Sequence, residues 1–476
     1  MKSPWSFGLA AGFGLLSAAA VLRDLEATAA IALAAPVGAV LVRRPEWLAG
    51  LVTAEMLLGG HGHLLDVGAL SLRQVLTAAL LAVWIVHKAL SGDWRMRGGP
   101  FGWAVAAFLG LFFTIAAVDA AAGRDEALRE SATVVHALLF FPLADLASRP
   151  QGVDRLVRSF LVSVVAVGLF QLAITGIVSL GIVSEHRIYD PVNLSLGSPA
   201  RLASFFVRIF LLGSFFFPVA LLLLVAARWA GVALVSRLFD GLTLLLVLVA
   251  LVLGFTRGFW LGTVCGLAVL TPLLRRAARG RVLAGALVAA VLVPLALTAA
   301  WEARGVQLLV ARLVSIADPD NVSVAYRLQL YPRLVERIAE RPLLGYGFGV
   351  PVEVQVYFEN SFLYYLVKTG FLGLFVVGVC WIVVLAQAWQ VARDPSRPAR
   401  EQALGAGLAA ATVTMLLVTT INPFVNSPMG YFFLAWTAAL LYGLGQGRAA
   451  RRVDTIDATS DRQRGWPARN AASAMP

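Results

Sequence analysis

Charged side chains are scarce in this chain, in which Asp, Glu, Lys and Arg together make up 14% of 476 residues. Soluble domains carry about a quarter charged residues, so the composition excludes an ordinary soluble protein. Apolar residues reach 59% instead. They recur in uncharged runs close to the ~20 residues that a helix needs to cross a bilayer. The sequence therefore predicts an all-α, polytopic membrane protein.

Cysteine and histidine are also rare, with two and five residues in the whole chain. Cys265 and Cys380 each lie inside an apolar run without a CxxC partner, which argues against a disulfide and against a zinc site. His61 and His63, close to Asp66, are better explained as an interfacial turn than as metal ligands. We therefore expect no metal and no other cofactor.

Acidic residues are fewer than basic ones, 27 against 39, so the formal net charge is +12. A basic protein can bind nucleic acid, but here the arginines are spread over many short loops instead of one face. Membrane topology and anionic lipid head groups explain this distribution better. The expected partner is the lipid bilayer and not nucleic acid.

The apolar runs predict 12 to 14 transmembrane helices, the number being open because one run is short. The expected spans are 7–22, 27–42, 46–60, 67–90, 101–118, 131–147, 159–183, 205–227, 238–255, 258–274, 282–300, 361–388, 404–421 and 429–446. The first run follows Lys2 and resembles a signal peptide, but we expect it to be retained because further spans follow.

Four parts follow from these spans. Residues 1–300 hold the first eleven helices, 301–360 form a long outer loop, 361–446 hold the C-terminal helices, and 447–476 form a polar tail that we expect to be disordered. Arg and Lys are concentrated in every second loop, which predicts that these loops and both termini face the cytoplasm. The long loop then lies outside, where a loop of this length in a tight bundle is usually functional.

The long outer loop contains a predicted amphipathic helix over 324–341. Leu330, Leu334 and Ile338 form its apolar stripe, and Arg333, Arg337 and Arg341 form a basic one. Helical spacing places each set on one side. Such a helix is typical of a segment that lies along the outer leaflet. Solvated salt bridges are the alternative explanation for its arginines.

Arg257 lies in "LGFTRGFWLG", between two apolar runs that only a tight turn separates. An ionisable group at membrane depth is costly and usually faces a cavity or a partner. The planar guanidinium suits a phosphate group, and Gly258 permits close approach of backbone and ligand. The alternative is an arginine that snorkels to the lipid head groups.

Three segments in this order resemble the O-antigen ligase and O-antigen polymerase superfamily of bacterial envelope glycosyltransferases. They are "FTRGFWLG", "YRLQLYPRLVERIAERPLLGYGFG" and "ENSFLYYLVKTGFLGL", between Gly254 and Leu374. Arg201 in "SPARLASFF" matches an earlier family arginine more weakly, because the motif that often follows that arginine is missing.

The resemblance implies an inner-membrane enzyme whose donor is a glycan on undecaprenyl diphosphate at the periplasmic face. Family members transfer the glycan with inversion and without a metal ion to a glycan or lipid acceptor. Arg257 and Arg327 are then the expected diphosphate contacts, with Arg201 as a third. Arg333, Arg341, His186 and Arg187 are further candidates for substrate binding.

Glu359 and Asn360 occupy the position where the family's ligases have His-Asn. The family histidine is thought to activate the acceptor hydroxyl, and a carboxylate can serve as a general base in its place. Alternatively, Glu359 is an acid favoured by a helix start and Asn360 is the helix cap. The missing histidine favours a polymerase over a ligase.

A transporter or flippase is the competing class, because 12 to 14 helices is a common number for transporters. Inverted-repeat transporters place polar residues near the membrane midplane in both halves. The polar residues of this chain instead crowd the predicted outer face, which favours an enzyme.

Overall fold

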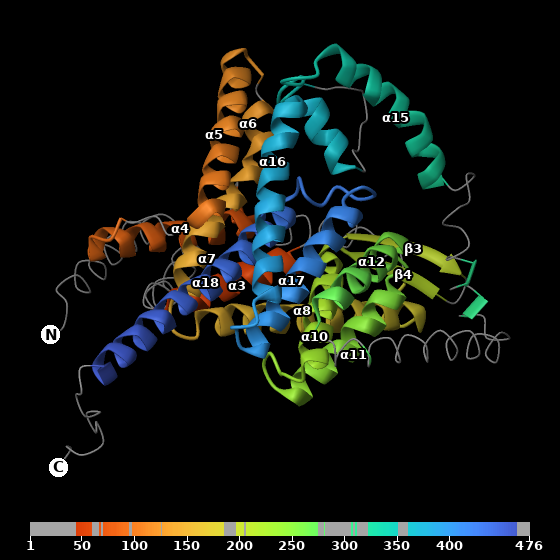
Figure 1. Cartoon of the computed structure of the whole chain (residues 1–476). Helices are drawn as coiled ribbons and strands as arrows, with labels where there is room; N and C mark the ends of the chain where they lie inside the picture. The colour runs from red at the N-terminus through yellow and green to blue at the C-terminus, as the bar shows by residue number, and fades with distance from the viewer. Residues whose placement is uncertain are drawn as a thin grey trace, which may run out of the picture.

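Helices make up most of the computed structural model, which confirms the predicted all-α polytopic membrane fold (Figure 1). The structure describes residues 44–59, 66–67, 70–94, 98–124, 126–184, 197–203, 206–274, 280, 306–307, 310–311, 322–350 and 360–463. For 66–67, 70, 197–203, 206–207, 322–324, 327 and 447–463, only the backbone is described. The predicted spans 7–22, 27–42 and 282–300 lie outside these residues.

Seven helical segments within the described part are long and apolar enough to cross a membrane. They are Leu72–Ser91, Gly99–Ala121, Glu126–Ala147, Gly152–Ser179, Leu212–Ala230, Ser361–Arg393 and Ala399–Val418. Each corresponds to a predicted span. The predicted span 46–60 is a helix of 14 residues, which is shorter than a perpendicular crossing needs.

The first half of the chain contains short elements between its long helices. In order they are α3 (Pro45–Leu58), β1 (Asp66–Val67), β2 (Leu70–Ser71), α4 (Leu72–Ser91), α5 (Gly99–Ala121), α6 (Glu126–Ser131), the 3₁₀ helix η1 (Ala132–Leu139), α7 (Phe140–Ala147) and α8 (Gly152–Ser179). A capping box at Ser71 and Gln74 starts α4. Its two reciprocal bonds satisfy backbone N–H groups that a helix start leaves open.

The second half holds a hairpin and the later helices. In order they are β3 (Gly197–Ala203), β4 (Phe206–Leu211), η3 (Leu212–Phe215), α10 (Phe216–Ala230), α11 (Arg237–Leu253), α12 (Arg257–Leu273), α15 (Val322–Glu340), α16 (Ser361–Arg393), α17 (Ala399–Val418) and α18 (Pro428–Gln463). In Figure 1, α5 and α16 stand side by side and α15 lies across the top, apart from α10, α11 and α12.

The predicted span 205–227 is wrong in its first part. Phe206–Leu211 forms strand β4, which pairs antiparallel with β3, and helix begins only after Leu211. The segment "FVRIFL" is apolar, and such a short run fits a buried strand as well as a helix. Its β-branched and aromatic residues favour the strand once a partner strand is available.

The predicted disordered tail is also partly wrong, because α18 continues to Gln463. Residues 447–463 contain several Arg and Ala residues, which have high helix propensity. After Pro428, the next proline is Pro467. The remainder of the tail, 464–476, lies outside the described residues.

Helix α16 is longer than predicted and broken once. Gly370 has φ 65° and ψ −166°, so α16 consists of a short first segment, 361–369, and a long second one. This conformation is accessible to glycine and strained for other residues. The break leaves backbone groups without their partners inside the helix, and because Gly370 is buried, other parts of the protein must satisfy them.

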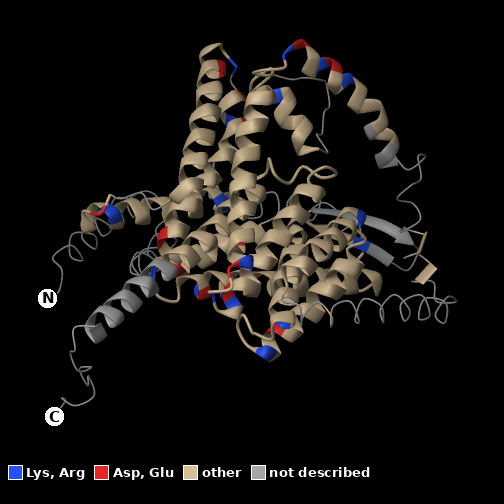
Figure 2. Cartoon of the chain, viewed as in Figure 1, with Lys and Arg blue, Asp and Glu red and all other residues tan. Residues whose placement is uncertain are grey.

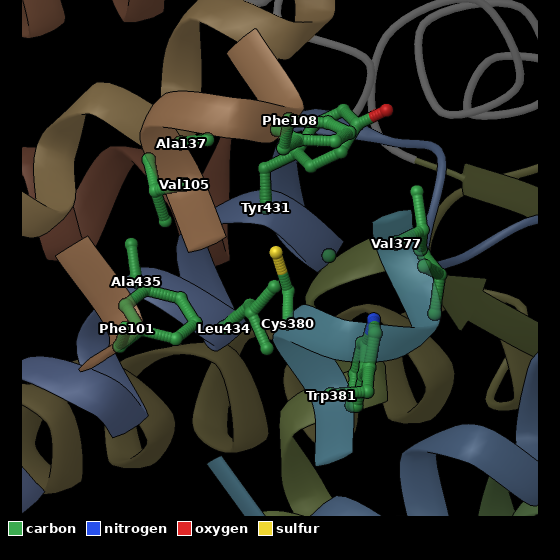
Figure 3. Close-up of a pocket in the computed structure, with 12 residues that line it drawn as sticks. Phe101, Val105, Phe108, Ala137, Val377, Cys380, Trp381, Tyr431, Leu434 and Ala435 are labelled. Atoms are coloured by element: carbon green, nitrogen blue, oxygen red, sulfur yellow. The ribbon is translucent and has the colours of Figure 1, made fainter. Parts of the chain in front are cut away.

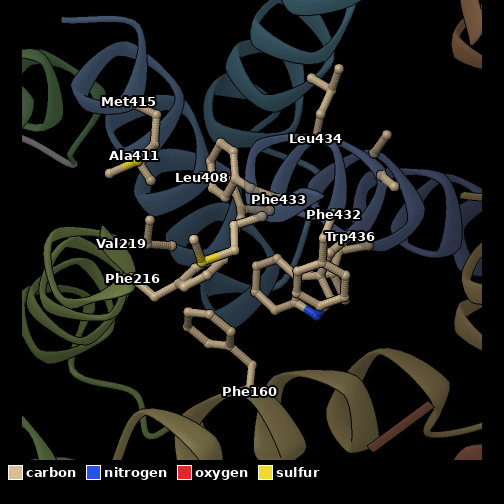
Figure 4. Packing of buried hydrophobic residues seen from close by; sticks show 14 of the residues in the cluster. Phe160, Phe216, Val219, Leu408, Ala411, Met415, Phe432, Phe433, Leu434 and Trp436 are labelled. Carbon is tan, nitrogen blue, oxygen red and sulfur yellow. The ribbon is translucent and has the colours of Figure 1, made fainter. Parts of the chain in front are cut away.

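One hydrophobic core connects most of the helices. Figure 4 shows its aromatic centre, where Phe160 of α8 meets Trp436 of α18 with ring centroids 4.5 Å apart. Phe216 of α10 packs edge-on against Phe432 of α18. These contacts are large and specific, and they hold α8, α10 and α18 together.

Charged side chains gather at two ends of the molecule (Figure 2). At one end, ion pairs join loops that the sequence assigned to the same side. Arg155 of α8 bonds Glu46 of α3 at 3.1 Å, and Lys88 of α4 lies 3.1 Å from Asp145 of α7. Arg400 of α17 pairs with Asp154 of α8. The opposite end carries the α5–α6 turn and α15 (Figures 1 and 2).

Candidate functional site

The start of α12 presents Arg257. Trp260 donates from Nε1 to the carbonyl of Leu251 at 2.9 Å, which closes the turn between α11 and α12. Phe255 in this turn has φ 46°, a conformation that non-glycine residues rarely adopt. Arg257 is half-buried and is the first residue of the helix. Its positive charge and the helix dipole both favour an anion at this end.

Three glycines on one face of α12 bring this helix against α17. A Cβ on Gly262 would lie 2.8 Å from Val418, and one on Gly266 would lie 2.2 Å from Thr414. A Cβ on Gly258 would meet Asn422 at 3.3 Å. Small residues at this spacing let helix backbones approach closely in a membrane. Gly258 thus lies against the connection that follows α17.

The start of α16 is capped by Asn360. Its Oδ1 accepts hydrogen bonds from the backbone N–H groups of Phe362 (2.8 Å) and Leu363 (3.2 Å). The capping interpretation of Asn360 is therefore correct. Glu359 directly precedes it in the chain but lies outside the described residues.

The connection between α17 and α18, residues 419–427, links the two helix starts. Ser361 donates from its hydroxyl to Asn426 at 2.7 Å, and its N–H donates to the carbonyl of Thr419 at 3.2 Å. Asn422 of the same connection lies against Gly258. Arg257 and Asn360 thus start helices that both rest on one loop. The sequence interpretation assigned no role to this loop.

Helix α15 runs along the first segment of α16. Leu330 and Leu334 pack with Val367 and Leu363, and Phe371 donates to the carbonyl of Pro342 at 2.8 Å. Residues 330–334 of α15 pack with residues 363–367 of α16, and Pro342 meets Phe371 further along both segments. The residue numbers rise in the same direction along the two helices, so the helices are parallel. The predicted apolar stripe therefore contacts α16 and not the lipid surface.

This register indicates where Arg327 lies on α15. It precedes Leu330 by three residues and Leu334 by seven, which places it on the side of the helix that packs against α16. Because the helices are parallel, this position is closer to the start of α16 than Leu330 is. The side chain of Arg327 is not described.

The β3–β4 hairpin lies beside α12. The rings of Phe210 on β4 and Phe259 on α12 have centroids 5.9 Å apart. The guanidinium of Arg208 lies 5.4 Å from the centroid of Phe210. Arg201 pairs by backbone with Val207 in the same hairpin. The hairpin therefore brings the Arg201 backbone and Arg208 toward the helix that Arg257 starts.

The segment "RPLLGYGFG" seals the break in α16. Tyr346 and Gly347 donate their N–H groups to the carbonyls of Val367 (2.8 Å) and Lys368 (2.9 Å). Phe371 and Leu372, just after the break, donate to Pro342 and Leu343. These four bonds satisfy groups that the broken helix leaves open. Gly345, Gly347 and Gly349 have φ between 67° and 84°, which explains why the motif contains glycine.

Acidic residues of α5 and α6 anchor the glycine segment. Asp119 accepts from the N–H of Phe348 at 2.7 Å, and Glu130 accepts from the N–H of Gly349 at 2.7 Å. Lys368, only 5% exposed, donates to Glu130 at 2.9 Å. Lys368 therefore faces protein. The sequence interpretation gave the two acids no role, although both lie in the polar segment 119–130.

The remaining candidates do not meet at the helix starts. Arg333 and Arg341 are exposed, and Arg341 lies over the ring of Tyr346, at 5.0 Å from its centroid, beside the α16 break. Tyr346 also donates to Glu340, which lowers the pKa of that carboxyl below its usual value. His186 and Arg187 lie outside the described residues.

An apolar pocket between α5, α16 and α18 reaches the α17–α18 connection at Val425 (Figure 3). Its lining includes Phe101, Phe108, Val377 and Trp381. These side chains offer no charged group that could orient a substrate. Cys380 beside them and Cys265 on α12 are both free, as predicted.

Titratable side chains do not form a metal site in the described part of the chain, where no group of three or more His, Cys, Asp or Glu residues could hold an ion. The absence of a metal requirement remains a prediction of the family resemblance. The start of α12, with Arg257 as its first residue, is suited to an anion.

Comparison with known proteins supports the resemblance seen in the sequence. A family model described as O-antigen ligase matches residues 242–378. The matched part runs from α11 to the second segment of α16 and contains Arg257, Arg327, Glu359 and Asn360. Arg201 and the α17–α18 connection lie outside it. No curated protein matches the chain.

Proposed function

We propose, from the match of residues 242–378 to the O-antigen ligase family, that this membrane protein is a glycosyltransferase. Its donor is a glycan linked to undecaprenyl diphosphate, and its site lies at the periplasmic end of the bundle. We favour a polymerase, which transfers the glycan to a second glycan. A ligase, which transfers it to lipid A-core or another acceptor, is the alternative.

The observation that carries this proposal is the junction at residues 419–427. This loop contacts the first turn of α12, which begins with Arg257, and the first turn of α16, which follows Glu359. It joins the start of α12 and the start of α16, which are far apart in the sequence. A diphosphate leaving group and an acceptor hydroxyl require these two kinds of residue.

The arginines would act on the leaving group. The acceptor oxygen attacks the anomeric carbon of the donor sugar from the face opposite the diphosphate, and the bond from carbon to diphosphate oxygen breaks with inversion. The diphosphate leaves with the electron pair, so negative charge grows on its oxygens. Arg257 at the helix start, with Arg327 and Arg201, would stabilise this charge.

Glu359 would act on the acceptor. The attacking hydroxyl loses its proton as the new bond forms, and a carboxylate at the start of α16 can accept it. Asn360 holds this helix start through its cap bonds and does not itself need to contact the substrate. The Glu in place of the family histidine is the reason for favouring a polymerase.

A deletion strain complemented with variants tests the function. We expect wild type and Arg237→Ala to restore long glycan chains, because exposed Arg237 lies at the opposite end of α11 from the site. Arg257→Ala, Arg327→Ala and Glu359→Gln should leave single repeat units. The level of each variant in the membrane is checked by immunoblot.

The pattern of glycans separates the possibilities. Full-length polymer on undecaprenyl diphosphate, absent from its final acceptor, would identify a ligase. Normal glycan in all three variants would contradict the proposed site. Normal glycan in the deletion strain itself would contradict the enzyme and favour the transporter.

A further inference from the structure

Asn422 presents a polar group beside Gly258, at the start of α12. Its side chain is half-buried and lies against Gly258, the residue that follows Arg257. Among the residues that the structure describes, none forms a hydrogen bond with its side-chain amide. Because the side chain is only half-buried, part of it stays open to solvent. A ligand that enters from that side can therefore reach this amide.

The backbone around Asn422 is held in place. Its N–H donates to Val418 at 3.0 Å, and its carbonyl accepts from Phe424 at 2.8 Å. The buried ring of Phe424 stacks on Phe215 with centroids 4.5 Å apart. The amide is therefore presented from a rigid connection, as a binding residue should be.

The second asparagine of this connection has a different environment. Asn426 accepts from Ser361 at 2.7 Å and so serves the start of α16. The side chain of Asn422 forms no such hydrogen bond with the described residues of α12 and only packs against Gly258. Asn426 therefore positions the start of α16, while the amide of Asn422 is left available to a molecule that enters the site.

The chemistry of the amide selects the ligand. A carboxamide is neutral and both donates and accepts, which suits sugar hydroxyls. A diphosphate needs positive charge, which Arg257, the residue before Gly258, carries. We propose that Asn422 forms a sugar-binding subsite that holds the donor glycan beside its diphosphate. This inference rests on the proposed function.

Binding of two probe lipids to the purified full-length protein tests this subsite. The probes are undecaprenyl diphosphate with its glycan and undecaprenyl diphosphate without it. Loss of one neutral hydrogen bond weakens binding about five- to tenfold. We expect Asn422→Ala to weaken binding of the glycan-bearing lipid by this factor and to leave the bare lipid unchanged. Arg257→Ala should weaken both.

Thr420→Ala is the matched control, because the Thr420 hydroxyl donates only to Leu417 in its own helix turn. It should bind both lipids as wild type does. Equal affinity of Asn422→Ala and wild type for the glycan-bearing lipid, with Arg257→Ala weakened, would overturn the subsite alone. Equal loss for both lipids in Asn422→Ala would also overturn it, since that indicates a structural role. Failure of wild type to bind either lipid would overturn the proposed function and the subsite together.

Discussion

The N–H of Phe371 donates to the carbonyl oxygen of Pro342 at 2.8 Å, and this bond ties the break in α16 to the segment that follows α15. Gly370 lies directly at the break, and a Cβ there would come within 2.3 Å of the Leu343 backbone. The long loop is therefore attached to a membrane helix by backbone bonds, and its position depends on one glycine.

Gly370→Ala should lower stability by about 1–3 kcal/mol or more, because alanine is strained at this φ and its methyl group meets backbone atoms that cannot move away. Thermal unfolding of the detergent-solubilised protein measures the effect. Gly378→Ala in the second segment of α16 is the control, since a Cβ there meets nothing within 4 Å. Equal melting temperatures of Gly370→Ala and Gly378→Ala would contradict this role of Gly370.

Glu130 and Lys368 should show strong coupling. Removing one partner of a buried ion pair commonly costs about 3–5 kcal/mol, because the other charge stays buried. We expect Glu130→Gln and Lys368→Met each to destabilise the protein, and the double variant to be less unstable than the sum of the two. A double-mutant cycle on thermal unfolding gives the coupling. The exposed pair Arg129 and Glu126 serves as the reference, and its coupling energy should be about 0.2–1 kcal/mol. If the losses of stability in Glu130→Gln and Lys368→Met simply add in the double variant, the predicted coupling is refuted.

Gly266→Ala should separate α12 from α17 and so move Arg257. The new methyl group would lie 2.2 Å from the Thr414 hydroxyl and 2.7 Å from Leu222. Overpacking of this kind costs about 1–3 kcal/mol. Stability and transfer activity should both fall, while Gly110→Ala on α5, with nothing within 4 Å, should change neither. Full activity of Gly266→Ala would show that this contact does not position the site.

Cysteine labelling should assign the two ends of the bundle to opposite sides of the membrane. Arg129, 82% exposed at its side chain, lies near the proposed site, and exposed Arg237 lies at the other end. A membrane-impermeant maleimide added to cells with a permeabilised outer membrane should label Arg129→Cys but not Arg237→Cys. Wild type, with its two free cysteines, gives the background. Labelling of Arg237→Cys alone would reverse the proposed orientation.

Much of the membrane fold could be predicted because a spanning helix needs a long apolar run, which is visible in the sequence. The runs that became α5, α8, α16 and α17 were identified in this way. The run at Phe206–Leu211 was misassigned since apolar character alone does not separate a short strand from a helix. The break at Gly370 was missed because a single glycine inside an apolar run is compatible with an unbroken helix.

The candidate site was only partly predictable. Arg257 was conspicuous because a charge beside apolar runs is costly, and the cap at Asn360 follows from its place before an apolar run. Asn422 was not recognised, since an asparagine before a proline is common in ordinary turns. Its relevance comes from contact with Gly258, a residue distant in the sequence.

The sequence by itself determined that this is a helical membrane protein, which of its loops share a side, and which arginines stand at unfavourable places. These features depend on local composition and on the cost of burying charge in lipid. Only the tertiary structure decided that one loop supports the starts of both α12 and α16, and that the glycine segment seals a broken helix. Such contacts join distant parts of the chain through packing and backbone hydrogen bonds, which no local pattern of residues encodes.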